Sequence, residues 1–291
     1  MKKMNEIRTE VITKLQGLLQ NENVLLESVD IVKLNDLFHY GIVFRSGEIG
    51  KTLYINDFVN DGMSADEIAD EMLMAYENSV DAPPYEMVNE LQAKQPLSDV
   101  KESLYVALLE VARNKTYLKD IPYQKVSEGL AYICQIRYID NSGTGSMCAA
   151  VTNALVESNG WDIGELFDTA INNTLRHDTP LLCSMQDALF SAPENLLDKN
   201  ECHSFDLLVL TNASQCFGAA TLFLPGVIDK IHACVGGDFF AIPSSMHEII
   251  IVPESLDIGI DNLSAMCREA NATVVEQKDI LSNYVMHFTR K

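Results

Sequence analysis

The chain has 291 residues, 47% of them hydrophobic, which is enough for about two domains with sizeable cores. Its 42 acidic residues outnumber its 21 basic ones and give a formal net charge of −21. This balance argues against non-specific nucleic-acid binding and against docking on anionic lipid, since both need clustered Lys and Arg. No apolar run approaches the roughly 20 residues of a membrane-spanning helix, so we expect no membrane segment.

The N-terminus carries Lys2 and Lys3, but charged side chains at Glu6, Arg8 and Glu10 interrupt the segment that follows. A secretion signal needs an apolar segment at this place, so none is expected. Apolar residues at spacings of three and four instead predict a helix with one apolar face, made of Met4, Ile7, Val11, Leu15 and Leu18.

The seven cysteines are odd in number, widely spaced and free of any CxxC pair. Disulfide frameworks are typical of small secreted chains, so we interpret most of these cysteines as small buried hydrophobic residues in a cytoplasmic protein. Cys202–His203 and His232–Cys234 lack a second pair of ligands at a usual spacing. No metal site is therefore predicted, and no cofactor.

Residues 37–44 and 52–55 have the composition of two strands and predict a hairpin. Ser64 and Glu67 then form a capping-box pattern, in which each side chain accepts a hydrogen bond from the main-chain N–H of the other. A helix is expected to begin here. Its staple pair and apolar face are formed by Met63, Ile68, Met72, Ala75 and Tyr76.

The same order of features returns later in the chain. Residues 130–138 and 148–152 predict two strands around a polar turn, and Asp162 with Glu165 takes the positions of a second helix cap. Two interpretations stay open: an internal duplication of a ββα unit, or independent occurrence of common motifs. Between the two copies, residues 97–117 predict a helix whose apolar stripe is Leu104, Leu108, Val111 and Ala112.

The C-terminal third differs in pattern. Residues 205–210 and 216–223 predict buried strands, and Pro225 is placed to begin a helix that ends at Gly236. Residues 239–242 and 248–252 predict a strand pair, and Asp261 is expected to start a helix that Asn271 terminates. The inward face of that helix is predicted to be Leu263, Met266, Cys267 and Ala270, and residues 284–289 alternate as a half-buried closing strand.

These elements predict an α/β protein of the α+β type, with mixed or antiparallel sheets and packed helices. Two ββα-like units and a C-terminal α/β unit fit the pattern. We expect an N-terminal unit over 1–118 and a C-terminal unit over 119–291, with a further boundary near 191–204.

Two segments of the second half carry a resemblance to a known family. The first runs from Trp161 to Phe167 and continues through residues 170–174, and the second covers residues 237–250 with the run Ile242-Pro243-Ser244-Ser245-Met246-His247-Glu248. Both resemble an uncharacterised family of bacterial proteins, a domain of unknown function found in anaerobic Firmicutes. The resemblance extends over most of the chain. It implies a bacterial cytoplasmic origin and no mechanism.

The best local candidate for a site lies within this second segment. Ser244, Ser245, His247 and Glu248 place two hydroxyls, an imidazole and a carboxylate within five positions. His247 and Glu248 would point to opposite faces of an entering strand, which weakens a direct dyad. The functional interpretation is a polar ligand held by Ser245 and His247. The structural interpretation, which we favour, is that the serines bond turn amides and His247 bonds a main-chain carbonyl.

Cys216 precedes His247 in the chain and raises the alternative of a cysteine–histidine hydrolase. Nucleophilic cysteines usually lie in electropositive, partly exposed settings, whereas an apolar stretch follows Cys216. We therefore predict a buried, inert thiol and name no catalytic residue.

Two functional hypotheses result. The favoured one is a non-enzymatic cytoplasmic binding or regulatory protein, whose acidic surface would attract a protein partner with a basic surface. The alternative is a hydrolase that uses residues 244–248 or Cys216. The enzyme hypothesis requires His247 in a cleft, with a nucleophile and an orienting acid within hydrogen-bond reach. The oligomeric state stays open.

Overall fold

A computed structural model describes residues 2–20, 22–47, 49–78, 96–139, 146–188, 194–198 and 207–290. The chain divides into two units, Met1–Ala93 and Lys94–Lys291. Sheets in both units are antiparallel and packed with helices, which confirms the predicted α+β class. In the described part of the chain, no helix combines the length and the apolar character that membrane crossing requires.

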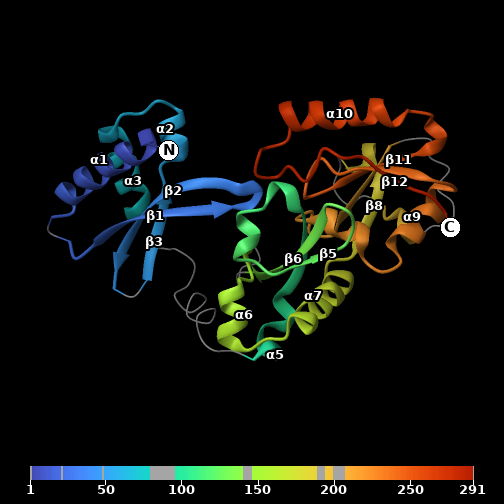
Figure 1. The fold of residues 1–291 in the computed structure, drawn as a ribbon, viewed down its shortest axis with the longest axis horizontal. Coiled ribbons are helices and arrows are strands. Elements are labelled where there is room, and N and C mark those ends of the chain that lie inside the picture. The colour runs from blue at the N-terminus through green and yellow to red at the C-terminus, as the bar shows by residue number, and fades with distance from the viewer. Residues whose placement is uncertain are drawn as a thin grey trace. The chain divides into compact units, whose positions relative to one another are not determined.

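The first unit is a three-stranded meander with helices on it (Figure 1). Its elements are α1 (Lys2–Leu18), β1 (Leu25–Lys33), η1 (Leu34–Asp36), β2 (Leu37–Ser46), β3 (Ile49–Tyr54), α2 (Asn56–Asn60) and α3 (Ala65–Glu77). The core lies between α1, α3 and the sheet and includes the fully buried Val11, Leu15, Ile42 and Met72. The predicted hairpin is confirmed, whereas β1 was not predicted, and Leu18 is 53% exposed because Leu19 takes the inward position.

The cap of α3 has the predicted reciprocal form. Glu67 N–H donates to Ser64 Oγ at 3.3 Å, and Ser64 N–H donates to Glu67 Oε2 at 2.8 Å. The Ser64 bonds lower the pKa of the Glu67 carboxyl, because they stabilise its ionised form.

Replacing Ser64 with alanine should destabilise the first unit by about 1 kcal/mol, since the helix loses a satisfied main-chain donor. Urea unfolding followed by circular dichroism measures this change. Thr9→Ala is a suitable control, because the Thr9 hydroxyl bonds only its own helix, to Asn5 O. Equal stability of the two variants would contradict the role of the cap.

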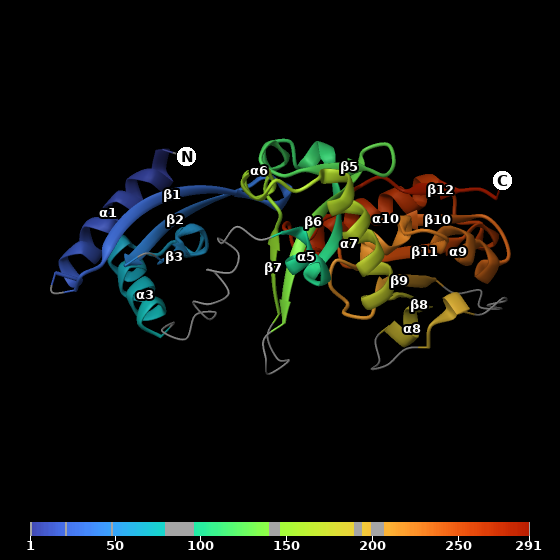
Figure 2. The same cartoon turned by 90° about the horizontal axis from the view of Figure 1, so that it is seen from below.

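The second unit begins with a four-stranded sheet. The strands are β4 (Leu104–Glu110), β5 (Tyr123–Lys125), β6 (Leu130–Ile139) and β7 (Ser146–Ala150), and β6 pairs with the other three. Short helices surround them: α5 (Leu97–Val100), η2 (Lys101–Ser103), η3 (Val111–Arg113) and η4 (Tyr117–Lys119). Then α6 (Asn153–Asn159) and α7 (Ile163–His177) follow, and α7 lies alongside the sheet (Figure 2).

The predicted helix over 97–117 is wrong. Its centre is β4, in which six of the seven residues are buried. A strand buried on both faces has no alternation of polar and apolar residues, so its apolar positions also satisfy a helical stripe. Because β4 pairs with β6, the expected boundary between Leu118 and Lys119 falls inside the second unit.

The rest of the second unit surrounds a five-stranded sheet of order β12-β10-β11-β9-β8. The strands are β8 (Pro180–Ser184), β9 (Leu208–Asn212), β10 (Phe239–Ile242), β11 (Ile249–Pro253) and β12 (Met286–Phe288). The helices are α8 (Met185–Ala188), η5 (Leu196–Asp198), η6 (Gly218–Phe223), α9 (Val227–Val235), η7 (Glu254–Leu256) and α10 (Ile260–Thr273). In Figure 1, α10 lies on one side of this sheet and α9 on the other.

Two further predictions for this region need correction. Residues 216–223 are a tight loop and a 3₁₀ helix rather than a strand, because Gly218 packs directly on the main chain of its neighbours. The last helix begins at Ile260 and runs past Asn271 to Thr273, and Met266 is 49% exposed instead of inward. The strand pair, the Gly236 cap and the closing strand are confirmed.

Both units contain a hairpin, a short helix, a left-handed glycine and a side-chain-capped helix, in that order. The glycines are Gly62 and Gly160, and the caps are Ser64 and Asp162. This order keeps the duplication hypothesis open. The polar turn at 140–145 lies outside the described residues, and so does the expected boundary at 191–204 except for residues 194–198.

Candidate functional site: a thiol pair beside a histidine and a carboxylate

The predicted site residues lie in the connection from β10 to β11. Ser244 is buried, and its carbonyl accepts a hydrogen bond from Leu281 N–H. Ser245 Oγ accepts one from His247 N–H at 3.0 Å, which is the turn-stabilising role expected of a serine. Glu248 is exposed. The four residues therefore do not converge on one point, and His247 alone reaches other functional groups.

His247 lies between two segments that are distant in the sequence. Its Nε2 is 3.3 Å from Asp279 Oδ1, and its Nδ1 accepts a hydrogen bond from Phe217 N–H at 3.2 Å. Because an ionised carboxylate only accepts hydrogen bonds, Nε2 carries the hydrogen of the neutral ring and Nδ1 keeps its lone pair. Nδ1 is therefore the ring nitrogen that can accept a proton, and it does so by giving up the hydrogen bond from Phe217 N–H. The side chains of His247 and Asp279 are 34% and 25% exposed, so solvent reaches them.

Main-chain pairing brings Asp279 to this place. Met246 N–H donates to Asp279 O at 2.8 Å, and Ser245 forms a β-bridge with Ile280. The carboxylate is therefore fixed relative to His247 by the backbone, not by a flexible side-chain contact alone.

On its other side, His247 faces the loop that follows β9. Gln215 and Phe217 have φ of 54° and 56°, the left-handed region that non-glycine residues seldom adopt, and Cys216 lies between them. Asn212 holds this conformation, since its Oδ1 accepts from Cys216 N–H at 3.1 Å and its Nδ2 donates to Cys216 O at 2.8 Å. The Cys216 thiol, which is partly buried, forms a hydrogen bond with the His247 side chain.

A buried ion pair between Arg137 and Asp178 stabilises the loop that contains Cys216. Asp178 accepts hydrogen bonds from Arg137, from Asn212 Nδ2 at 2.8 Å, and from both Ser214 N–H and Ser214 Oγ at 2.9 Å. The side chains of Arg137 and Asp178 are 9% and 3% exposed. The Arg137 guanidinium also lies 4.2 Å from the centre of the Tyr105 ring, a cation–π contact.

Arg137 connects this support to a second thiol. Cys148 on β7 is paired in register with Arg137 on β6, is exposed, and forms a hydrogen bond with Cys216. Arg137 Nη2 is also 3.5 Å from Cys216 O. Two free thiols from different segments therefore meet beside one guanidinium.

The two thiols differ in acidity. The hydrogen bond from Cys216, together with the Arg137 charge, lowers the pKa of Cys148 to about 7. The same hydrogen bond to Cys148 raises the pKa of Cys216 to about 12, against the opposing influence of His247. The contact with Cys216, followed by Asp279, raises the pKa of His247. The first proton lost from the pair thus leaves Cys148, and Cys216 keeps its own.

The other cysteines fit the sequence prediction in part. Cys134, Cys183 and Cys267 are buried free thiols, and burial raises the pKa of each. Cys234 is disulfide-bonded, which the wide and odd spacing of the cysteines did not suggest. Cys202 and His203 lie outside the described residues.

Sequence reasoning found His247 and considered Cys216, but it missed Asp279, Cys148, Asp178 and Arg137. The apolar neighbours of Cys216 and Cys148 predicted burial. The strand register would have identified Cys148 as a reactive thiol, because it pairs residue 148 with residue 137 and so places the thiol beside the Arg137 guanidinium.

One group of metal-type ligands occurs among the described residues, formed by Asp238, Glu254 and His287, whose ligand atoms lie within 4.8 Å of one another. His287 Nε2 is already 3.3 Å from Glu254 Oε1, and Asp238 Oδ1 accepts from Arg290 N–H at 2.8 Å. These contacts within the protein explain why the three side chains lie close together.

Comparison with known proteins returns one match. The model of a family described as "Family of unknown function (DUF5688)" matches residues 4–290. No curated protein and no solved structure matches the chain.

Proposed function

The chain belongs to the DUF5688 family of unknown function, so we propose its function from the site itself: thiol–disulfide exchange at the Cys148–Cys216 pair. The observation that carries the proposal is the contact between two free thiols, of which one is exposed beside Arg137 and the other is bonded to a histidine–carboxylate pair. Catalytic dithiols need this asymmetry, because one thiol attacks and the other resolves.

Cys148 is the attacking thiol. It is exposed, and its pKa of about 7 makes a large fraction of it thiolate near neutral pH. The thiolate attacks one sulfur of a substrate disulfide, forms a mixed disulfide with it, and releases the other substrate sulfur as a thiolate.

Cys216 is the resolving thiol. Its proton passes to His247, and the resulting thiolate attacks the Cys148 sulfur of the mixed disulfide. A Cys148–Cys216 disulfide forms and the second substrate sulfur leaves, so two electrons have passed from the thiol pair to the substrate. Asp279 acts through His247, because it accepts the Nε2 hydrogen, leaves Nδ1 as the basic nitrogen and stabilises the imidazolium. Protonation of Nδ1 replaces the hydrogen bond that it accepts from Phe217 N–H.

The direct test combines alkylation and disulfide mapping. In the reduced protein, the rate of Cys148 alkylation by iodoacetamide should rise with pH around a midpoint near 7. Cys216→Ala should move this midpoint upward, towards the ordinary thiol value, because the Cys216 hydrogen bond is the largest cause of the lowered pKa. Oxidised glutathione should produce one new disulfide-linked peptide pair that contains Cys148 and Cys216.

The matched control is Cys183→Ser, which alters a buried free thiol that bonds Val209 O and should leave both results unchanged. An unmoved midpoint in Cys216→Ala, or the absence of a Cys148–Cys216 disulfide, would reject the proposal.

A second candidate is the hydrolase predicted as the alternative from the sequence. Cys216, His247 and Asp279 form a thiol, an imidazole and a carboxylate in the relation of a catalytic triad. The raised pKa of Cys216 argues against it as the first nucleophile, and Ser245 Oγ bonds a main-chain amide rather than the imidazole. Covalent capture of an activated ester by Cys216 in a Cys148→Ser variant would favour the hydrolase, since exchange requires both thiols.

The sequence-based hypothesis of a binding or regulatory protein with a basic partner stays a prediction, supported by the net charge of −21. It is compatible with a thiol pair whose substrate disulfide belongs to a protein. The bacterial origin and the cytoplasmic location also stay predictions. The disulfide of Cys234 is a reason to test the location by fractionating the native host, because structural disulfides are uncommon in the cytosol.

A further inference from the structure

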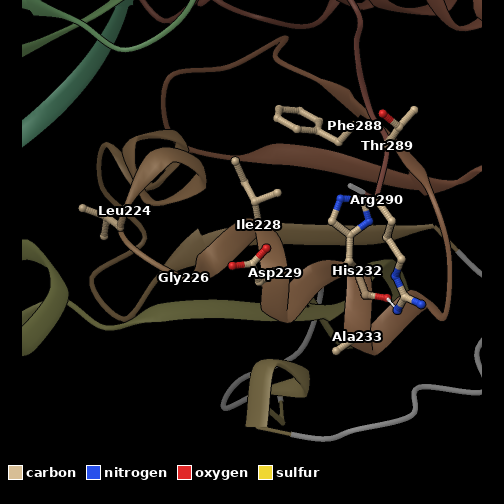
Figure 3. A pocket seen from close by; sticks show the side chains of 9 residues that line it. All are labelled: Leu224, Gly226, Ile228, Asp229, His232, Ala233, Phe288, Thr289 and Arg290. Atoms are coloured by element: carbon tan, nitrogen blue, oxygen red, sulfur yellow. Dashed lines mark hydrogen bonds between the residues drawn. The ribbon is translucent and has the colours of Figure 1, made fainter.

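A pocket of about 600 Å³ opens on the second unit between α9 and the segment that follows β12 (Figure 3). Ligand sites typically have volumes of about 300–1,000 Å³, an apolar wall and a few fixed polar groups. This pocket has both kinds of lining. Its residues include the apolar Leu224, Ile228 and Phe288 and the polar Asp229, His232 and Arg290.

The apolar wall is built on a stack of rings. Phe288 stacks on Phe239 with centroids 5.0 Å apart and an interplanar angle of 15°, and Phe223 lies against it at 6.3 Å. Phe239 is fully buried, so it fixes the plane on which Phe288 rests. A preformed apolar surface can receive an apolar group with little ordering cost.

The cationic side of the pocket is held in place by its neighbours. Arg290 N–H donates to Asp238 Oδ1 at 2.8 Å, and Arg290 Nη2 donates to His232 O. The His232 ring is itself fixed, since Nδ1 bonds Gly237 O at 2.8 Å and the ring meets Phe239 edge-on. A guanidinium has five N–H donors in a planar fork, so this anchoring leaves donors for a carboxylate.

The anionic side is Asp229, one turn before His232 on α9. In Figure 3 its carboxylate and the guanidinium of Arg290 lie on different sides of the His232 side chain. The two side chains, both in the described part of the chain, form no ion pair with each other. Because this carboxylate and this guanidinium line one pocket without pairing with each other, a ligand that carries both an ammonium and a carboxylate can pair with both.

We propose that this pocket binds small apolar zwitterions, that is, amino acids or dipeptides with apolar side chains. The ligand carboxylate pairs with Arg290, its ammonium pairs with Asp229, and its side chains lie on Phe288 and Ile228. The site does not involve the thiol pair, so it goes beyond the proposed function, and its test is independent of the test of thiol–disulfide exchange.

The test is calorimetric titration of the full chain with L-leucyl-L-leucine, its N-acetyl derivative and its C-terminal amide. The parent dipeptide should bind, and each derivative should bind about tenfold more weakly or worse, because each loses one charge-assisted contact. Equal binding of all three compounds, tighter binding of the N-acetyl form, or no binding of the parent would each overturn the proposal.

Matched variants locate the site. Arg290→Gln should weaken binding of the dipeptide and of its N-acetyl form, and Asp229→Asn should weaken binding of the dipeptide and of its amide. Arg268→Gln on α10 and Asp168→Asn on α7 make the same charge changes at exposed positions outside the pocket and should bind like the unaltered chain. Cys148→Ser should also bind normally. Unchanged binding in Arg290→Gln would show that the ligand sits elsewhere.

Discussion

Replacing Gly218 with alanine should destabilise the second unit by about 3 kcal/mol, near the upper end of typical overpacking costs. A Cβ at this position would lie 2.3 Å from Thr211 Oγ1, 2.5 Å from His247 O and 2.8 Å from Asn212 N. Two of these three atoms, His247 O and Asn212 N, belong to the main chain, so no side-chain rotation can move them away. Accommodating the methyl group requires β9 or the β10–β11 connection to shift.

The same substitution should also disable the thiol site. Thr211 Oγ1 donates to His247 O at 2.9 Å, and a shift there moves His247 away from Phe217 and Cys216. We therefore expect the alkylation midpoint of Cys148 to rise even in the fraction that folds, because its contact with Cys216 loosens.

Gly237→Ala is the matched control for this prediction, since a Cβ there meets no atom within 4 Å. It should change the free energy of unfolding by no more than about 0.5 kcal/mol, as surface substitutions usually do. Urea unfolding compares the two variants. Equal stability of Gly218→Ala and Gly237→Ala would show that the short distances around Gly218 do not limit the size of the side chain at this position.

Local rules predicted the features that depend on only a few neighbouring residues. The helix starts at Ser64 and Asp162 were found because a cap is a contact between a side chain and an amide three residues ahead. Hairpins and the Gly236 terminus were found for the same reason. A strand that is buried on both faces has no such short-range signal. The apolar residues of β4 therefore also fit a helical pattern, and the sequence predicts a helix there.

The thiol site could not be assembled from the sequence, because its parts come from separate segments. Strand register brings Cys148 to Arg137, and main-chain pairing of residue 246 with 279 brings Asp279 to His247. The residues with a left-handed backbone conformation beside Cys216 are Gln215 and Phe217, so the glycine that usually indicates such a turn is absent from the sequence. Apolar neighbours then made an inert thiol the natural prediction.

The partial success with His247 has a physical reason too. Its hydroxyl-rich, proline-bounded neighbourhood marked a turn, and turns at strand ends carry functional side chains more often than cores do. Ser245 bonds a turn amide, as the structural interpretation expected, whereas Ser244 contributes its main-chain carbonyl, which accepts from Leu281 N–H. The imidazole does not bond a main-chain carbonyl as that interpretation expected, but accepts from Phe217 N–H in the thiol loop.

Replacing Asp178 with alanine should destabilise the second unit by about 3–5 kcal/mol, the cost of leaving a buried charge without its partner. Arg137 is 9% exposed and would lose its carboxylate, while Asn212 Nδ2 and both Ser214 donors would lose an acceptor. Because Asn212 and Ser214 belong to the loop around Cys216, the loss should also loosen the contact between the two thiols.

An exposed pair provides the contrast. Lys101 and Glu102 are 3.8 Å apart with side chains 54% and 70% exposed, so Glu102→Ala should cost no more than about 1 kcal/mol. Thermal and urea unfolding of the two variants measure the difference between a buried and a solvated ion pair. A similar small effect in both would mean that the Asp178 network adapts without it.

A double variant separates the loss of charge balance from the loss of the site. Arg137→Met combined with Asp178→Leu removes both charges, so it should recover part of the stability lost by Asp178→Ala alone. It should not restore the thiol chemistry, because Arg137 contributes to the low pKa of Cys148 and Asp178 holds the loop of Cys216. Recovered stability with a Cys148 alkylation midpoint still near 7 would show that neither charged residue acts on the thiols, and the arrangement of the site would have to be explained by Cys216 and His247 alone.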